Sequence, residues 1–242
     1  MANEIELRRK RIELYCKEVS NATCGFPEIP RKLGILNAAN VPSLATRKEN
    51  FIKLVSENFS SEKHFDSGLV DDVINPWPDN DNAKNAKKAY KSLKEYSETA
   101  YGALVVKRIL EDNKKKGLKR FFIRLDDNST ARAGTDWISL PSAFPKREVF
   151  PGGEDMDALA VIHHEFGHTR IFTNRKKAIA VTPQEERLVV INNSNPVRML
   201  NKKEPRYTYL FEGRQTINII TGEVKSGIWS YDKTNPKLLV RP

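Results

Sequence analysis

The feature that most constrains this chain is a short apolar run that ends in histidines and a glutamate. Residues 157–168 read Asp-Ala-Leu-Ala-Val-Ile-His-His-Glu-Phe-Gly-His. The part from His164 to His168 matches the pattern H-E-x-x-H. Residues four apart lie one above the other on the same face of a helix, so the imidazoles of His164 and His168 can reach one metal ion.

Glu165 directly follows the first histidine of this pattern. In that position a glutamate can take a proton from a water molecule that a bound zinc ion activates. The segment therefore predicts a zinc-dependent hydrolase, most simply a peptidase, with His164 and His168 as ligands and Glu165 as general base. The alternative is a buried helix with two incidental histidines. Three of the chain's four histidines fall in this segment, which favours the metal site.

The surrounding residues predict that the motif lies on a helix. Leu159, Ile162 and Phe166 recur at helical spacing and form a stripe suited to burial. Acidic residues, Asp157 among them, precede the stripe and favour a helix N-terminus there. His163 points about 100° away from His164 around the helix axis. We therefore expect His163 to pack against the protein or support the site instead of binding the metal.

A catalytic zinc site usually has three protein ligands and one open position. The chain has no histidine at position 174, where one group of H-E-x-x-H enzymes places its third ligand. Thr182 and Pro183 predict the start of a second helix that carries Glu185 and Glu186. Either carboxylate could be the third ligand, with a slight preference for Glu186. The alternative is that both only complement the dipole of the helix.

The order of the predicted elements indicates an α+β fold. The layout is a helix, a small mixed sheet, the motif helix and a second, glutamate-bearing helix, which is similar to that of zincin metalloproteases. In that layout a sheet edge can hold an extended peptide by strand addition. Turn-forming residues at 75–82 separate a helical N-terminal region, 1–80, from a zincin-like metallopeptidase domain, 81–242. We expect helices at 3–19, 47–58 and 83–113, the last hinged near 96–100, and strands at 121–125, 137–140, 207–211, 215–220 and 225–231.

Composition limits the other possibilities. No run approaches the roughly 18 apolar residues of a membrane-spanning helix, and the N-terminus lacks the apolar stretch of a signal peptide. We therefore expect a protein made in the cytoplasm that leaves, if at all, by a specialised secretion route. Cys16 and Cys24 are expected to be free thiols. The net charge of +10 suggests acidic partners, but the basic residues are scattered, which disfavours nucleic acid.

In several segments the chain resembles bacterial effector zinc metallopeptidases. That family includes type III effectors that cleave host mitogen-activated kinases and related toxin domains of type VI systems. The resemblance covers roughly residues 90–212. It rests on the segments 97–102, 164–168, 185–186, 195–198 and 205–209. Ser194 stands where the family usually has glutamate, and Asn201 or Lys202 where it has glycine.

The resemblance implies a zinc endopeptidase that is delivered into a target cell and cleaves a protein there. A delivery partner or a neutralising immunity protein is then expected. Arg206 and Tyr209 are the implied donors to the oxyanion of the tetrahedral intermediate. For Tyr209 the alternative is an ordinary strand aromatic, and for Asn195 and Arg198 we favour a network that caps a helix C-terminus.

Two other functions stay open at the level of sequence. One is a zinc hydrolase that acts on peptidoglycan peptides, since a basic protein suits an anionic cell wall. The other is a non-catalytic basic binding module with a relic metal site.

Overall fold

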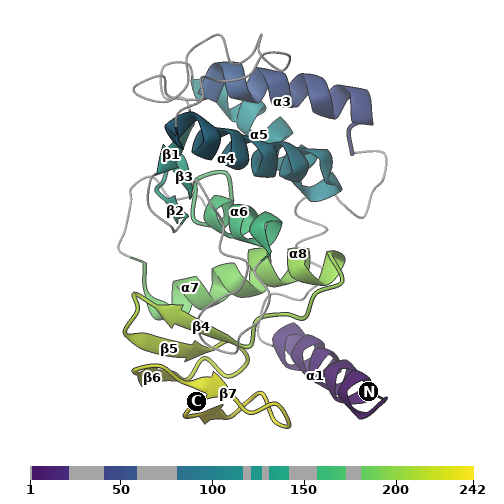
Figure 1. Ribbon diagram of the computed structural model, residues 1–242, viewed down its shortest axis with the longest axis vertical. Coiled ribbons are helices and arrows are strands. Elements are labelled where there is room, and N and C mark those ends of the chain that lie inside the picture. The colour runs from purple at the N-terminus through teal and green to yellow at the C-terminus, as the bar shows by residue number, and fades with distance from the viewer. Residues whose placement is uncertain are drawn as a thin grey trace. The chain divides into compact units, whose positions relative to one another are not determined.

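The computed structural model of the chain describes residues 2–21, 41–58, 81–116, 121–126, 131–141, 157–172 and 181–242. These residues form helices and small sheets, so the protein has an α+β fold, as expected (Figure 1). Within the described ranges, no helix is long and apolar enough to cross a membrane. The chain divides into two compact units: a terminal unit of residues 1–30, 145–160 and 179–242, and a central unit of residues 31–144 and 161–178.

Three helices pack against one another in the central unit: α3 (Leu44–Asn58), α4 (Asp81–Glu98) and α5 (Ala100–Lys116). The hinge expected near 96–100 is confirmed, because α4 and α5 are separate helices that meet at Thr99. The hydroxyl of Thr99 donates to the carbonyl of Tyr96 at 2.6 Å and accepts from the backbone N–H of Gly102 at 3.0 Å. A Cβ on Gly102 would lie 1.8 Å from the Tyr96 carbonyl oxygen, so this bend requires glycine.

The central unit also contains most of the helix α6 (Ala158–Gly167) and a small mixed sheet. The strand order of this sheet is β1 (Phe122–Asp126), β3 (Trp137–Pro141), β2 (Arg132–Ala133). Strand β1 runs parallel to β3, and β2 runs antiparallel to it. Ile123 pairs with Ile138 in the β1–β3 ladder, and both side chains are fully buried. The strands expected at 121–125 and 137–140 are therefore confirmed.

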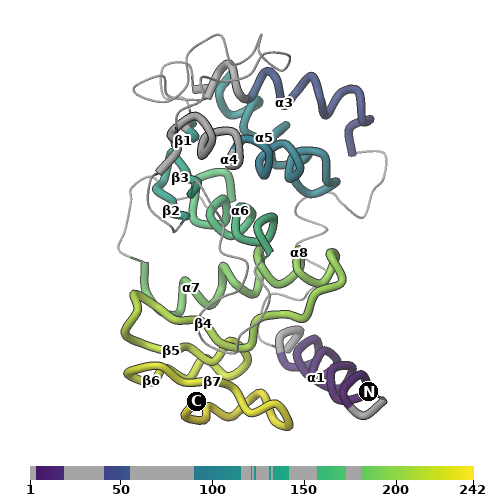
Figure 2. The backbone as a smooth tube through the Cα atoms, viewed as in Figure 1, coloured from purple at the N-terminus to yellow at the C-terminus, as the bar shows by residue number. Residues whose placement is uncertain are grey.

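The terminal unit combines helices with two small antiparallel sheets. Its helices are α1 (Ala2–Asn21), α7 (Pro183–Val189) and α8 (Asn195–Leu200), with the π-helical turn η3 (Val190–Ser194) between the last two. The first sheet contains β4 (Thr208–Phe211), β5 (Gln215–Asn218) and β6 (Val224–Ser226), and the second contains β7 (Ser230–Tyr231) and β8 (Leu239–Val240). Figure 2 traces the path from α7 through α8 to these strands.

One strand prediction in this unit was wrong. The segment 225–231 was expected to be continuous, but it forms the separate strands β6 and β7. Gly227 lies between them with φ of +90°, a backbone conformation that favours glycine and turns the chain. Gly222, in the connection between β5 and β6, also has a positive φ, of +78°.

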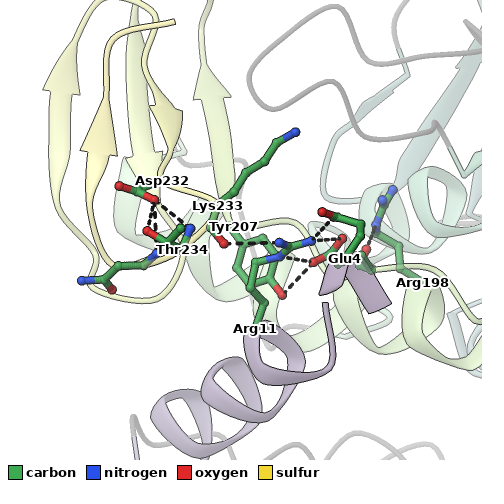
Figure 3. Close-up of polar contacts among 9 residues, drawn as sticks. Glu4, Arg11, Arg198, Tyr207, Asp232, Lys233 and Thr234 are labelled. Carbon is green, nitrogen blue, oxygen red and sulfur yellow. Dashed lines mark hydrogen bonds and ion pairs between the residues drawn. The ribbon is translucent and has the colours of Figure 1, made fainter. Parts of the chain in front are cut away.

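Helix α1 packs on the C-terminal part of the terminal unit. Tyr15 lies in one apolar cluster with Val190, Tyr207 and Ile217. Arg11 is buried beside this cluster and donates from Nε to a carboxylate oxygen of Glu204 at 2.6 Å (Figure 3). The N-terminal helix is therefore part of the terminal unit's core.

Some expectations fall on parts of the chain that the structure does not describe. The turn-rich segment before residue 81 and Cys24 belong to them, so the division at residue 80 stays a prediction. Cys16 is a free thiol, as expected, and burial raises the pKa of that thiol.

Candidate metal centre

The motif helix α6 (Ala158–Gly167) begins at an acidic cap. Oδ1 of Asp157 accepts hydrogen bonds from the backbone N–H groups of Leu159 and Ala160, at 3.1 and 3.2 Å. These two N–H groups have no partner within the helix, so the carboxylate satisfies them and complements the helix dipole. The N-terminus predicted from the acidic residues is therefore correct at Asp157.

The apolar stripe of α6 is buried as predicted. Ile162 and Phe166 are fully buried, and Leu159 is partly buried. The ring of Phe166 stacks on Tyr96 with 5.6 Å between ring centroids and lies 5.9 Å from Phe121. This packing fixes the rotation of the helix about its axis, and therefore the direction of the residues on its other faces.

The two histidines of the motif point at one place. Nε2 of His164 lies 3.1 Å from Nε2 of His168, and their ring centroids are 4.8 Å apart. Two nitrogens bound to one tetrahedral zinc ion at about 2.0–2.1 Å are about 3.4 Å apart. The spacing of the two nitrogens thus already fits a shared metal ion.

Glu186 is the candidate third ligand. Together with His164 and His168 it makes a group that could hold a metal ion. His164 and Glu186 are buried, and His168 is partly buried. Glu165, which directly follows His164 on α6, is only 8% exposed. Burying a charged carboxylate is costly unless an opposite charge lies nearby, and a divalent cation would supply that charge.

Glu185 and Glu186 have different surroundings, although they are adjacent in sequence. Thr182 caps α7: its hydroxyl accepts from the N–H of Glu185 at 3.2 Å, and the Glu185 carboxylate accepts from the N–H of Thr182 at 3.0 Å. Glu185 therefore belongs to a capping box, while Glu186 is buried. The sequence did contain a signal for this choice, because threonine followed three residues later by glutamate is the capping-box pattern.

His163 packs inside the central unit, as the sequence predicted. Its Nδ1 lies 2.6 Å from the hydroxyl oxygen of Tyr96, and the rings of Tyr101 and Phe172 lie edge-on to it. Burial is the main reason that the pKa of His163 is lowered to about 3, and the neighbouring His164 lowers it further. His163 is therefore neutral, and it is not part of the group that could hold a metal ion.

Arg170 anchors the chain just after the motif, and sequence reasoning missed it. Its guanidinium donates to Asp112 at 2.8 Å and to Asp136, and its backbone N–H donates to the carbonyl of Thr135 at 2.9 Å. These contacts tie the end of the motif segment to α5 and to the turn before β3. The acidic partners lie 58 and 34 residues earlier in the chain, so no local pattern could reveal them.

Asn195 and Arg198 do not form the expected cap of a helix C-terminus, because Asn195 is the first residue of α8 and both side chains bind other segments instead. The amide of Asn195 donates to the carbonyl of Arg206 at 2.9 Å and accepts from its N–H at 2.7 Å, and it also donates to the hydroxyl of Tyr15 at 3.0 Å. Nε of Arg198 donates to the carbonyl of Glu204 at 2.8 Å. Both residues therefore hold the segment after α8 in place.

Arg206 and Tyr209, the implied oxyanion donors, lie together in the terminal unit. The guanidinium carbon of Arg206 is 4.7 Å from the centroid of the Tyr209 ring, and Tyr209 pairs with Ile217 in the β4–β5 ladder. A cation over an aromatic face is a stabilising contact in its own right. The catalytic role of this pair stays a prediction.

Comparisons with family models, with characterised proteins and with solved structures give no match for this chain. Inferences about its function therefore rest on the residues and geometry described above.

Proposed function

We propose that this chain is a zinc-dependent peptidase with a zincin-like catalytic domain. The observation that carries the proposal is the 3.1 Å separation of the His164 and His168 Nε2 atoms in the H-E-x-x-H segment, at the C-terminal end of α6. The spacing of H-E-x-x-H alone places two imidazoles on one face. In the structure the two Nε2 atoms also lie close together, which suits two ligands of a single ion.

The donor set supports zinc. Two imidazole nitrogens and one carboxylate, from His164, His168 and Glu186, leave a fourth tetrahedral position for a reactant. The same three donor types also serve non-haem iron. The glutamate that follows the first histidine favours hydrolysis, because a carboxylate beside the metal is the general base of H-E-x-x-H peptidases.

The proposed reaction is hydrolysis of a peptide bond. A bound zinc ion would supply Lewis-acid chemistry by polarising the scissile carbonyl. Glu165 accepts the proton of the attacking water and delivers it to the leaving amine nitrogen, as a general base and then a general acid. Its 8% exposure keeps bulk water away from this carboxylate. Arg206 and Tyr209 are proposed donors to the oxyanion of the tetrahedral intermediate.

The proposed biological setting follows from the resemblance to bacterial effector zinc metallopeptidases. The protein would be made in the cytoplasm, delivered by a specialised secretion system, and act on a protein of the target cell. A delivery or immunity partner belongs to the same proposal.

Hydrolysis of a peptide library by the zinc-loaded protein tests the proposed activity, with Glu165→Gln and Glu185→Gln as matched variants. Both changes remove one carboxylate charge and keep the side-chain shape. We expect Glu165→Gln to retain zinc and lose about 10²–10⁴-fold in rate, the usual contribution of a general base. Glu185→Gln should stay within a few-fold of wild type, because glutamine also serves in a capping box. Equal rates for wild type and Glu165→Gln would contradict the proposal.

A further inference from the structure

The helical layer of the central unit is the most basic part of the described chain. Helices α3, α4 and α5 together carry 13 lysines and arginines against seven aspartates and glutamates. Their net charge of +6 is more than half of the chain's +10. Charge concentrated in one layer attracts anions and raises their local concentration.

A cavity of about 380 Å³ opens in this layer, between α3, α5 and the residues that precede α3. Three lysines line it: Lys53 from α3, and Lys107 and Lys114 from α5. Its volume lies within the range of about 300–1,000 Å³ that is typical of small-molecule sites. Scattered surface lysines are normally just solvated, but here three of them border one hollow.

The wall before α3 is held in place by hydrogen bonds. Nε of Arg47 donates to the carbonyl of Pro42 at 2.8 Å, and the hydroxyl of Ser43 accepts from the N–H of Thr46 at 3.2 Å. These contacts fix Pro42 and Ser43 against the first turn of α3. The cavity therefore has a preformed wall, which lowers the conformational entropy that a ligand has to overcome.

The remaining lining residues differ in chemistry from the lysines. Asn50, Thr46 and Glu111 offer hydrogen-bonding groups, while Pro42 and Leu110 offer apolar surface. A ligand that matches all of these has an anionic group for the lysines, hydroxyl groups for the carboxylate and amide, and an apolar face. Lysine ammonium groups bind phosphate as point charges.

We propose that this cavity binds a small phosphate ester of the kind represented by a mononucleotide. The lysines contact the phosphate of the ligand. The Glu111 carboxylate accepts from a ligand hydroxyl, and the Asn50 amide donates to or accepts from another. The base of the ligand lies on the apolar wall. This inference is independent of the candidate metal centre, because none of its residues belongs to that site.

Calorimetric titration of the full chain with adenosine monophosphate, at physiological salt, tests this inference. Adenosine is the ligand control, since it lacks only the phosphate. The protein variants are Lys107→Glu, which reverses a charge in the cavity, and Lys115→Glu, which reverses an exposed charge on α5 outside it. Each change places a new glutamate four residues from Glu111, so the two variants share that repulsion within the helix.

We expect adenosine monophosphate to bind wild type, with adenosine at least about ten-fold weaker. Lys107→Glu should weaken the binding of the nucleotide at least about ten-fold, and Lys115→Glu less than about three-fold. Thermal unfolding of both variants checks that each is folded. Absence of nucleotide binding at millimolar concentration, or equal losses in the two variants, would overturn the inference.

Discussion

The hydroxyl oxygen of Tyr96 lies 2.6 Å from Nδ1 of His163, in the interior of the central unit. Tyr96 lies on α4, and His163 directly precedes the first candidate ligand on α6. The contact therefore links the helical layer to the motif helix through the one histidine of the segment that is not a candidate ligand. Its surroundings exclude water, because Tyr96 is fully buried and His163 is only 1% exposed.

Replacing Tyr96 with phenylalanine should destabilise the protein. The change keeps the ring that stacks on Phe166 but leaves Nδ1 of His163 buried without its partner. An unsatisfied buried polar group costs about 1–3 kcal/mol, and urea denaturation measures the loss directly. Tyr90→Phe is the matched control on the same helix, since Tyr90 is only partly buried and its ring packs edge-on against Phe51. Equal losses in the two variants would show that the hydrogen bond contributes nothing specific.

Arg170→Ala should lower the free energy of unfolding by about 2–3 kcal/mol. The Arg170 side chain is 7% exposed, and two carboxylates share its guanidinium. Removing one member of a buried ion pair leaves the others uncompensated. We discount the upper end of the usual range because Asp136 is half exposed. Arg108→Ala removes an exposed arginine of α5 and should cost less than about 0.5 kcal/mol. A loss below that value for Arg170→Ala would contradict its role as an anchor.

The part of the site that lies on continuous sequence could be predicted. The histidine spacing, the stripe of Ile162 and Phe166 and the Thr182 cap each depend on residues within one or two helical turns. The anchor at Arg170 could not be predicted, because its partners come from distant positions and only the tertiary fold brings them together. The same reason applies to Asn195, whose amide contacts Tyr15 from the other end of the chain.

Which of Glu185 and Glu186 is the candidate third ligand could be predicted only in part from local sequence. A capping box is a local pattern, and it accounts for Glu185. The burial of Glu186 depends on packing around α7, which no local pattern records. The break between β6 and β7 also escaped prediction, because a glycine inside a strand-like run is compatible with either a strand or a turn.

Helix α1 should be required for the stability of the terminal unit. Burial by itself would lower the pKa of Arg11, but the hydrogen bond and charge of Glu204 raise it above its ordinary value. The guanidinium also donates to the carbonyl of Lys233 at 3.2 Å (Figure 3). We expect Arg11→Ala to lower the free energy of unfolding by about 2–3 kcal/mol, since it leaves the Glu204 charge partly buried without its partner.

Arg9→Ala is the matched control for this prediction. Arg9 also pairs with a glutamate, Glu6, at 2.9 Å, but its side chain is 63% exposed against 4% for Arg11. An exposed pair of this kind contributes about 0–1 kcal/mol. Thermal or urea unfolding of both variants gives the comparison, and a similar loss in each would mean that α1 does not rely on the buried pair.

The central claim is that His164, His168 and Glu186 bind one zinc ion, and the zinc content of the purified chain tests it most directly. The measurement is made by plasma mass spectrometry after remetallation and dialysis, on wild type beside His168→Ala, Glu186→Gln and Glu185→Gln. We predict about one zinc per chain in wild type and in Glu185→Gln, and a large loss in the other two variants. A folded wild type without zinc, or loss of zinc in Glu185→Gln but not in Glu186→Gln, would contradict the account.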